Sequence, residues 1–109
     1  MSRYQVDPGS EGALTYAQSE DTVPADCKLD TNVSEIRISS DGSVLFCPNR
    51  GHDTVATFQL ASADGALQQM GRYETQHVPQ AIELTPDSTT LYSAGGDSTG
   101  TSFPAKDGA

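Results

Sequence analysis

The chain has 109 residues, a formal net charge of −9 and only six basic residues. It therefore lacks a basic patch that could neutralise successive phosphates, and we expect neither nucleic-acid binding nor attraction to an anionic membrane surface. Leu, Ile, Val and Phe make up about a sixth of the residues, which is below the level of about 20 % under which a highly charged chain is expected to lack a core of its own.

The first 33 residues contain two strand-like segments and a polar connection. The pattern of residues 4–7 and 11–16 is similar to that of residues 58–60 and 64–69. In both places a short strand begins with an aromatic residue and is followed by a turn, made of an acidic residue and Gly, and by a second strand. We predict that residues 1–18 are the last two strands of one sheet. Residues 19–33 are polar and contain proline, which favours a connection that runs over the surface.

The strongest signal in the chain is an internal repeat. Residues 36–46 (IRISSDGSVLF) recur as residues 82–92 (IELTPDSTTLY), an offset of 46 residues. Each copy has a short strand, a turn built on Asp and Gly or Ser, and a second strand rich in apolar and β-branched residues, which predicts an antiparallel hairpin. A repeat period in the forties, combined with strands, is typical of a β-propeller, whose blades are four-stranded sheets.

The remaining strands complete one blade. Residues 54–60 alternate in the manner of a third strand, and a turn at 63–65 leads to a more polar fourth strand. The predicted fold class is therefore all-β, a partial β-propeller of four-stranded antiparallel blades with roughly one complete blade and two partial ones. The predicted division is 1–18, the end of a preceding blade; 19–33, a connection; 34–74, a complete blade; and 75–109, the start of a following, truncated blade.

Neither metal chemistry nor membrane insertion is indicated. Cys27 and Cys47 have neither the CxxC spacing nor the companion histidines of a zinc site, and we expect no metal and no cofactor. The Asp-Gly pairs at 41–42 and 64–65 are expected to form turns, because Gly tolerates the positive φ that such turns require. The chain has no apolar run of membrane-spanning length, and its first residues lack a secretory pattern, which favours a cytoplasmic location.

Residues 34–46, continued by CPNRGHDTVATF at 47–58, resemble the lactonase family of seven-bladed propellers, which includes 6-phosphogluconolactonase-type and carboxymuconate-cyclising enzymes. The sequence of a blade in that family is commonly an acidic residue, a strand, a PDG turn, a second strand, the motif N-R-G-H-D-S-I and a further strand. The resemblance covers roughly residues 4–108 in pattern and is sharpest over residues 34–67. It implies part of a sugar-lactone hydrolase of carbohydrate metabolism. Its implied partners are a small lactone and the remaining blades. Where the family's next blade typically opens with Pro-Arg, this chain has Pro79-Gln80, so one cationic contact is absent.

Three residues are candidates for lactone chemistry, which needs a base for the attacking water and a donor for the oxyanion. Glu35 precedes an innermost strand and Arg50 ends the second strand, so both are predicted to reach the same end of the central channel. Glu35 would act as general base, and Arg50 would bind a carboxylate, a phosphate or the oxyanion. A purely structural Glu35–Arg50 ion pair is the alternative. His52 is a candidate proton shuttle or, alternatively, a turn residue.

Two other functions fit the same residues. The reverse type of chemistry, in which an unsaturated carboxylate is cyclised to a lactone, needs the same proton transfer and carboxylate binding. A propeller can also be a non-catalytic scaffold, since one fold hosts many functions. Convergence of Glu35, Arg50 and His52 on the channel favours catalysis, whereas their dispersal over the outer rim favours a scaffold.

Overall fold

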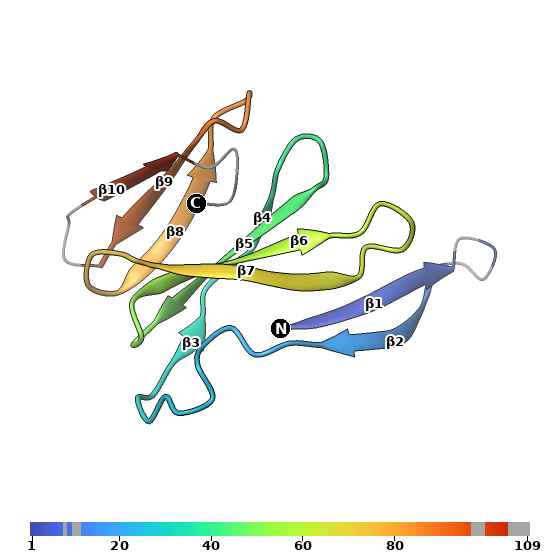
Figure 1. Cartoon of the computed structure of the whole chain (residues 1–109), viewed down its shortest axis with the longest axis horizontal. Coiled ribbons are helices and arrows are strands. Elements are labelled where there is room, and N and C mark those ends of the chain that lie inside the picture. The colour runs from blue at the N-terminus through green and yellow to red at the C-terminus, as the bar shows by residue number, and fades with distance from the viewer. Residues whose placement is uncertain (8, 10–11, 97–99, 105–109) are drawn as a thin grey trace.

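The computed structural model describes residues 1–7, 9, 12–96 and 100–104, the last five by their backbone alone. The regular elements in these ranges are strands, arranged in three antiparallel sheets that follow one another along the chain (Figure 1). Within the same ranges no helix is long and apolar enough to cross a membrane. The predicted all-β class, a partial β-propeller, is confirmed.

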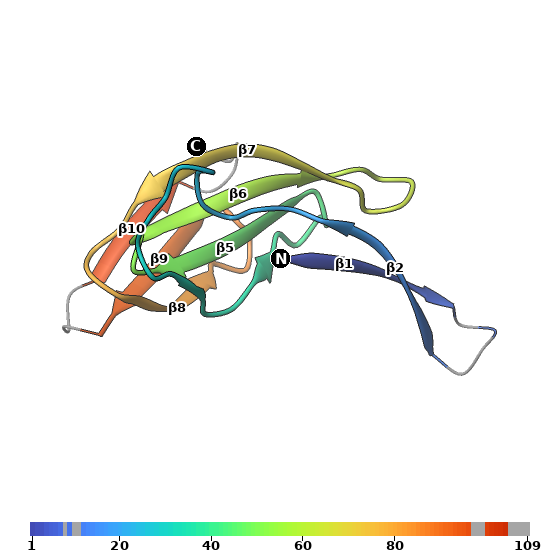
Figure 2. The same ribbon diagram turned by 90° about the horizontal axis from the view of Figure 1, so that it is seen from below.

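The first sheet is a two-stranded hairpin of β1 (Ser2–Asp7) and β2 (Ala13–Ser19), and it projects away from the rest of the chain (Figure 2). Tyr4 lies opposite Tyr16, and their rings meet edge to face with centroids 6.0 Å apart. Such aromatic cross-strand pairs stabilise antiparallel ribbons. The side chain of Gln18 fastens this hairpin to the next sheet, because it both donates to the carbonyl and accepts from the amide of Leu67.

The central sheet is a four-stranded blade whose innermost strand is interrupted. Two short strands, β3 and β4, both pair with β5, and β6 and β7 follow outward. The Asp-Gly pairs at 41–42 and 64–65 lie in the turns between β4 and β5 and between β6 and β7, as expected. The five strands are β3 (Asn32–Val33), β4 (Arg37–Ile38), β5 (Val44–Arg50), β6 (Thr54–Leu60) and β7 (Leu67–Glu74).

The third sheet contains β8 (Pro79–Leu84), β9 (Thr90–Gly95) and β10 (Gly100–Pro104). Its first hairpin repeats the central blade, because Leu84 pairs with Leu91 just as Ile38 pairs with Leu45. The self-match in the sequence is thus the same hairpin formed twice. Parts of the predicted following blade, at 97–99 and 105–109, lie outside the described residues.

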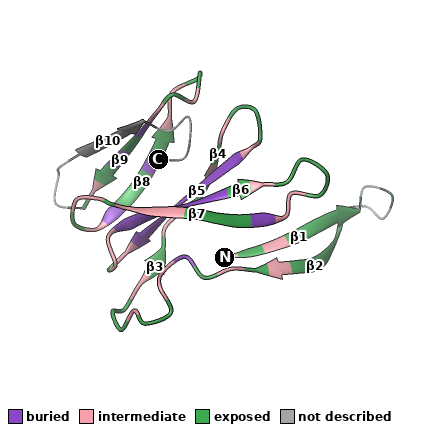
Figure 3. Cartoon of the chain, in the orientation of Figure 1, coloured by how far each residue is buried: buried purple, intermediate pink, exposed green. Residues whose placement is uncertain are grey.

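The central blade is buried on both faces, which explains the unbroken run of buried residues along β5 (Figure 3). One apolar cluster joins it to the third sheet, and a second cluster covers its opposite face, toward Met1 and the first sheet. Burial of one member, Cys47, raises the pKa of its thiol to about 11, so this cysteine is a core residue and not a nucleophile. The first cluster is Val44, Phe46, Val55, Ile82 and Leu91; the second is Leu45, Cys47, Ala56, Phe58 and Leu67.

Two aspartates organise the equivalent turns of the two hairpins. Asp41 Oδ1 accepts hydrogen bonds from the hydroxyls of Ser43 and Ser39, at 2.6 and 2.7 Å, and from the Ser43 amide. Asp87 has the same arrangement with neighbouring threonines. These hydroxyl and amide hydrogen bonds stabilise the charged form and lower the pKa of each carboxyl to about 2.

The lowered pKa values of Asp41 and Asp87 predict an acid-dependent loss of stability. Each carboxyl has a folded-state pKa below its unfolded value of about 3.9. The stability it contributes is therefore fully present above about pH 4 and is lost as the pH falls toward 2. We expect the urea midpoint to fall over this range in the wild type and to fall less in the double variant Asp41→Asn/Asp87→Asn. Identical acid profiles for the two proteins would show that these turns are not the cause.

Candidate functional site

Glu35 lies in the interruption between β3 and β4, at the inner edge of the central blade. One carboxylate oxygen accepts a hydrogen bond from the backbone amide of Ile82 in β8, 2.5 Å away. The other oxygen lies 3.7 Å from the guanidinium of Arg37, and the side chain remains 26 % exposed. Glu35 therefore links the innermost strands of two neighbouring sheets and still presents its carboxylate to the solvent side.

Arg37 is a site residue that the sequence analysis missed. Its guanidinium lies between Glu35 and Glu83, at 3.7 Å from a carboxylate oxygen of each. The three side chains form a row of alternating charge that crosses from β4 to β8. A signal for it existed in the sequence, because positions 37 and 83 are equivalent in the internal repeat and carry opposite charges.

Arg50 ends β5, opposite Asn32 at the start of the innermost strand. Its Nε atom is buried and has no hydrogen-bond partner among the described residues. The structure shows no Glu35–Arg50 ion pair, since Glu35 is paired with Arg37 instead. Arg50 as a whole is half-buried, and an acceptor for the buried Nε would relieve the cost of leaving this N–H without a hydrogen bond among the described residues.

His52 lies in the turn between β5 and β6 and is held by its own hairpin. Its Nδ1 atom is 2.8 Å from the hydroxyl of Thr54. The same hydroxyl accepts a hydrogen bond from the amide of Asn49, which also donates to the carbonyl of Thr22. This network fixes the imidazole next to the Arg50 end of the strand. A proton-shuttle role for His52 stays a prediction.

The same turn also carries Asp53, which ties the central blade to the start of β8. Its carboxylate accepts hydrogen bonds from the amides of Gly51 and Val78, both at 3.1 Å, and lies 2.9 Å from Nδ1 of His77. Partial burial acts to raise the pKa of this carboxyl, but the hydrogen bonds from His77, Val78 and Gly51 outweigh it and lower the pKa. Asp53 thus joins the turn after β5 to His77 and Val78, the residues that precede β8.

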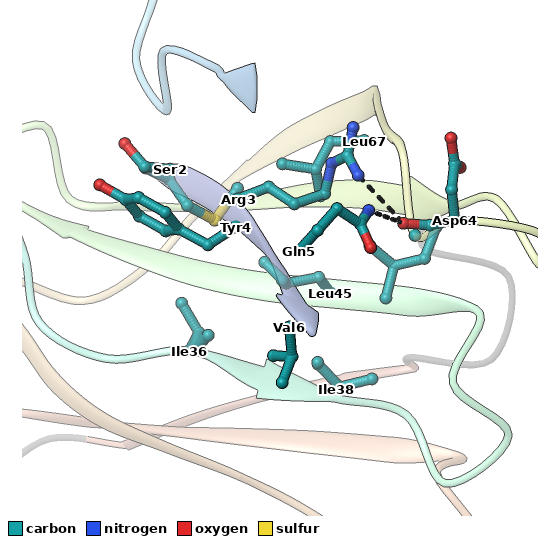
Figure 4. A pocket seen from close by; sticks show the side chains of 13 residues that line it. Ser2, Arg3, Tyr4, Gln5, Val6, Ile36, Ile38, Leu45, Asp64 and Leu67 are labelled. Atoms are coloured by element: carbon teal, nitrogen blue, oxygen red, sulfur yellow. Dashed lines mark hydrogen bonds between the residues drawn. The ribbon is translucent and has the colours of Figure 1, made fainter. Parts of the chain in front are cut away.

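A cavity of about 510 Å³ lies elsewhere, between β1 and β4 (Figure 4). Its walls are mainly apolar, and none of Glu35, Arg50 and His52 lines it. It is therefore not the place where those three residues act. Within the described ranges there is also no group of three or more His, Cys, Asp or Glu residues that would hold a metal ion.

Comparison with known proteins identifies the family to which this fold belongs. Residues 2–106 match the family model described as lactonase, 7-bladed beta-propeller. The chain belongs to this lactonase family. The resemblance to this family that the sequence indicated is thereby confirmed.

Solved structures agree with the assignment to the lactonase family. A protein from Lactobacillus plantarum superposes with a TM-score of 0.90 at 27 % identity, over 99 % of this chain and 32 % of the other. The periplasmic gluconolactonase PpgL of Pseudomonas aeruginosa superposes with a TM-score of 0.80 at 26 % identity, over 85 % of this chain and 26 % of the other.

Among curated sequences, an uncharacterized protein from Lactococcus lactis subsp. cremoris is 35 % identical over 71 residues, which is 64 % of this chain and 21 % of that protein. The chain thus spans about a fifth of the length of this curated relative.

Proposed function

We propose that the chain supplies part of a lactone-hydrolysing site, with Glu35 as general base and Arg50 as the group that binds the anionic portion of the substrate or the oxyanion. The observation that supports this most directly is the buried Nε of Arg50, which has no acceptor among the described residues. Glu35 supports it as well, because its carboxylate accepts a hydrogen bond from the Ile82 amide and its side chain is still partly exposed at the inner edge.

In this proposal the lactone is opened by water. The Glu35 carboxylate takes a proton from the water molecule as the water oxygen bonds to the carbonyl carbon. The negative charge that develops on the carbonyl oxygen is stabilised by the guanidinium of Arg50. The ring C–O bond then breaks, and the alkoxide recovers the proton from Glu35. The product is the open hydroxy acid, and the carboxylate is restored. No oxidant or cofactor is consumed in this sequence.

We further propose a sugar lactone as the substrate, in the manner of 6-phosphogluconolactonase and within carbohydrate metabolism. The similar protein from Pseudomonas aeruginosa is a gluconolactonase, and Arg50 offers a cationic group to a carboxylate or a phosphate. The remaining blades of the ring would complete the pocket and are the partners that this function requires.

The test is the rate of gluconolactone hydrolysis by this chain together with the remaining blades of the ring. The rate is compared between the wild type and two site variants. Glu35→Gln and Arg50→Ala are each expected to lower kcat/KM by about 100-fold, the size typical of losing a base or an oxyanion donor. The matched control comes from the outermost strand, β7, where Glu74→Gln makes the same change at an exposed side chain. Wild-type rates in both site variants, or an equal loss in the control, would remove Glu35 and Arg50 from the mechanism.

A further inference from the structure

Residues 75–78 connect β7 to β8, and Asp53 of another turn holds them in place. The connection lies next to the turn between β5 and β6, at the same end of the central blade (Figure 1). The carbonyl of Asp53 accepts a hydrogen bond from the amide of Thr75 at 2.9 Å. Its carboxylate accepts a second from the amide of Val78 at 3.1 Å and lies 2.9 Å from Nδ1 of His77. Three of the four residues in this connection are therefore bound by one residue of the neighbouring hairpin.

Val78 has a backbone conformation that its side chain disfavours. Its φ is +55°, in the left-handed region, where a β-branched residue is a genuine outlier. Such a conformation persists only where the surrounding structure imposes it, and outliers of this kind concentrate at functional sites. The imposing contacts are present on both sides of the residue, because the Val78 amide donates to Asp53 and the Val78 carbonyl accepts from the amide of Gly96 at 2.8 Å. The strain at Val78 is thus held between the central blade and the third sheet.

The contact between Asp53 and Val78 is the first of three that join the central blade to the backbone of β8 and of the residue before it. In each contact a side chain of the central blade bonds to a main-chain group, and these groups follow one another along the chain. The last contact holds the candidate general base. The three are Asp53 with the amide of Val78, Ser34 with the carbonyl of Pro79 at 3.3 Å, and Glu35 with the amide of Ile82. The direction in which the chain enters β8 therefore determines where the Ile82 amide lies.

We propose that Asp53 is a positioning residue of the lactone-hydrolysing site. It holds Val78 in the left-handed conformation and thereby sets the entry of the chain into β8. The Ile82 amide then stays within hydrogen-bonding distance of the Glu35 carboxylate. This inference rests on the proposed role of Glu35 as general base. Asp53 acts through β8 and does not touch the substrate.

The alternative is that Asp53 only stabilises the fold. Replacing a purely structural residue lowers the free energy of unfolding but leaves the rate of the folded protein unchanged. Replacing a positioning residue lowers the rate of the folded protein, because a displacement of about 1 Å at a reacting group can cost about 100-fold. The two roles are therefore separated by the kinetics of the folded protein and by a substitution that removes the need for Asp53.

The first measurement is gluconolactone hydrolysis by this chain together with the remaining blades of the ring. Asp53→Ala is expected to lower kcat by about 10-fold and to change KM by less than about threefold, because the base acts in the chemical step and not in substrate binding. Asp64→Ala is the matched control, since the Asp64 carboxylate binds the amide of Ala66 within its own turn, at the opposite end of β6. This control is expected to keep the wild-type kcat.

A second substitution, at Val78, tests whether the strained backbone is the link. Gly adopts a positive φ without a Cβ penalty, so Val78→Gly removes the need for the Asp53 contact. In an Asp53→Ala background, Val78→Gly is expected to restore kcat to within about threefold of the Val78→Gly protein. Val78→Ala removes the same two methyl groups but keeps the Cβ atom, and it is expected to give no such recovery. Equal recovery with Gly and Ala would overturn the proposal, because side-chain packing and not backbone conformation would then be responsible.

Amide hydrogen exchange over residues 76–84 reports on the same contacts without substrate. Exchange there is expected to be at least about tenfold faster in Asp53→Ala and unchanged in Asp64→Ala. Unchanged exchange in Asp53→Ala would overturn the inference whatever the value of kcat. If Glu35→Gln is inactive and exchange is faster, a wild-type kcat in Asp53→Ala would also overturn it. Wild-type activity in Glu35→Gln would instead reject the proposed function and the catalytic part of this inference, while faster exchange in Asp53→Ala would still show that Asp53 holds the entry to β8.

Discussion

Gly51→Ala is expected to lower the free energy of unfolding by at least about 3 kcal/mol, which is enough to unfold much of a marginally stable chain. Gly51 has a φ of +94°, a conformation that costs an L-residue with a side chain about 1–2 kcal/mol. A Cβ atom at this position would also lie 1.9 Å from the carbonyl oxygen of Asp30. The connection that covers the end of β5 would have to move away, and the network around Asn49 and Thr22 would move with it.

The matched control for Gly51→Ala is Gly65→Ala in the turn between β6 and β7. Gly65 also has a positive φ, +74°, but a Cβ atom there would meet nothing within 4 Å. This variant is expected to lose only about 1 kcal/mol. Urea denaturation followed by circular dichroism, at one fixed protein concentration, measures both values. Equal losses for Gly51→Ala and Gly65→Ala would show that the connection does not pack on β5 as described.

Phe58→Ala is the second large effect, with an expected loss of about 3–5 kcal/mol. Phe58 is fully buried in the second apolar cluster, where it packs with Leu45, Ala56 and Leu67. Removing the ring leaves a cavity in the face of the central blade that is directed toward the first sheet.

Met70→Ala serves as the comparison for Phe58→Ala. Met70 is 42 % exposed on β7, and its truncation is expected to change the free energy of unfolding by no more than about 0.5 kcal/mol. Both variants are measured by urea denaturation at the same protein concentration. A loss for Phe58→Ala below about 1 kcal/mol would mean that the second cluster forms no real core.

The strands of the central blade were predictable because local signals agree with the fold. Alternation marks residues 54–60, and the Asp-Gly turns mark the hairpin ends. The interruption between β3 and β4 was not predictable, because the carboxylate of Glu35 in that gap binds an amide of the neighbouring sheet. The burial of β5 on both faces likewise depends on the stacking of sheets, which no local pattern contains.

For the candidate site, residue types were predictable and partners were not. The sequence indicated Glu35 and Arg50 by their places in the blade, yet Glu35 is paired with Arg37, and the buried Nε of Arg50 has no hydrogen-bond partner in the part of the chain that the structure describes. The contact of His77 with Asp53 joins residues 24 positions apart across two sheets. Such contacts depend on how one sheet is rotated against the next, which residue spacing along a single strand does not determine.

Thermal melting of the monomer tests most directly whether these sheets remain folded only when further blades cover them. The measurement is a circular dichroism melt of residues 1–109, at a dilution where sedimentation gives monomer alone. The uncovered faces of the first and third sheets predict a broad transition of low amplitude at modest temperature. A sharp, cooperative transition of the monomer would show that one chain closes a core by itself, and it would contradict the account.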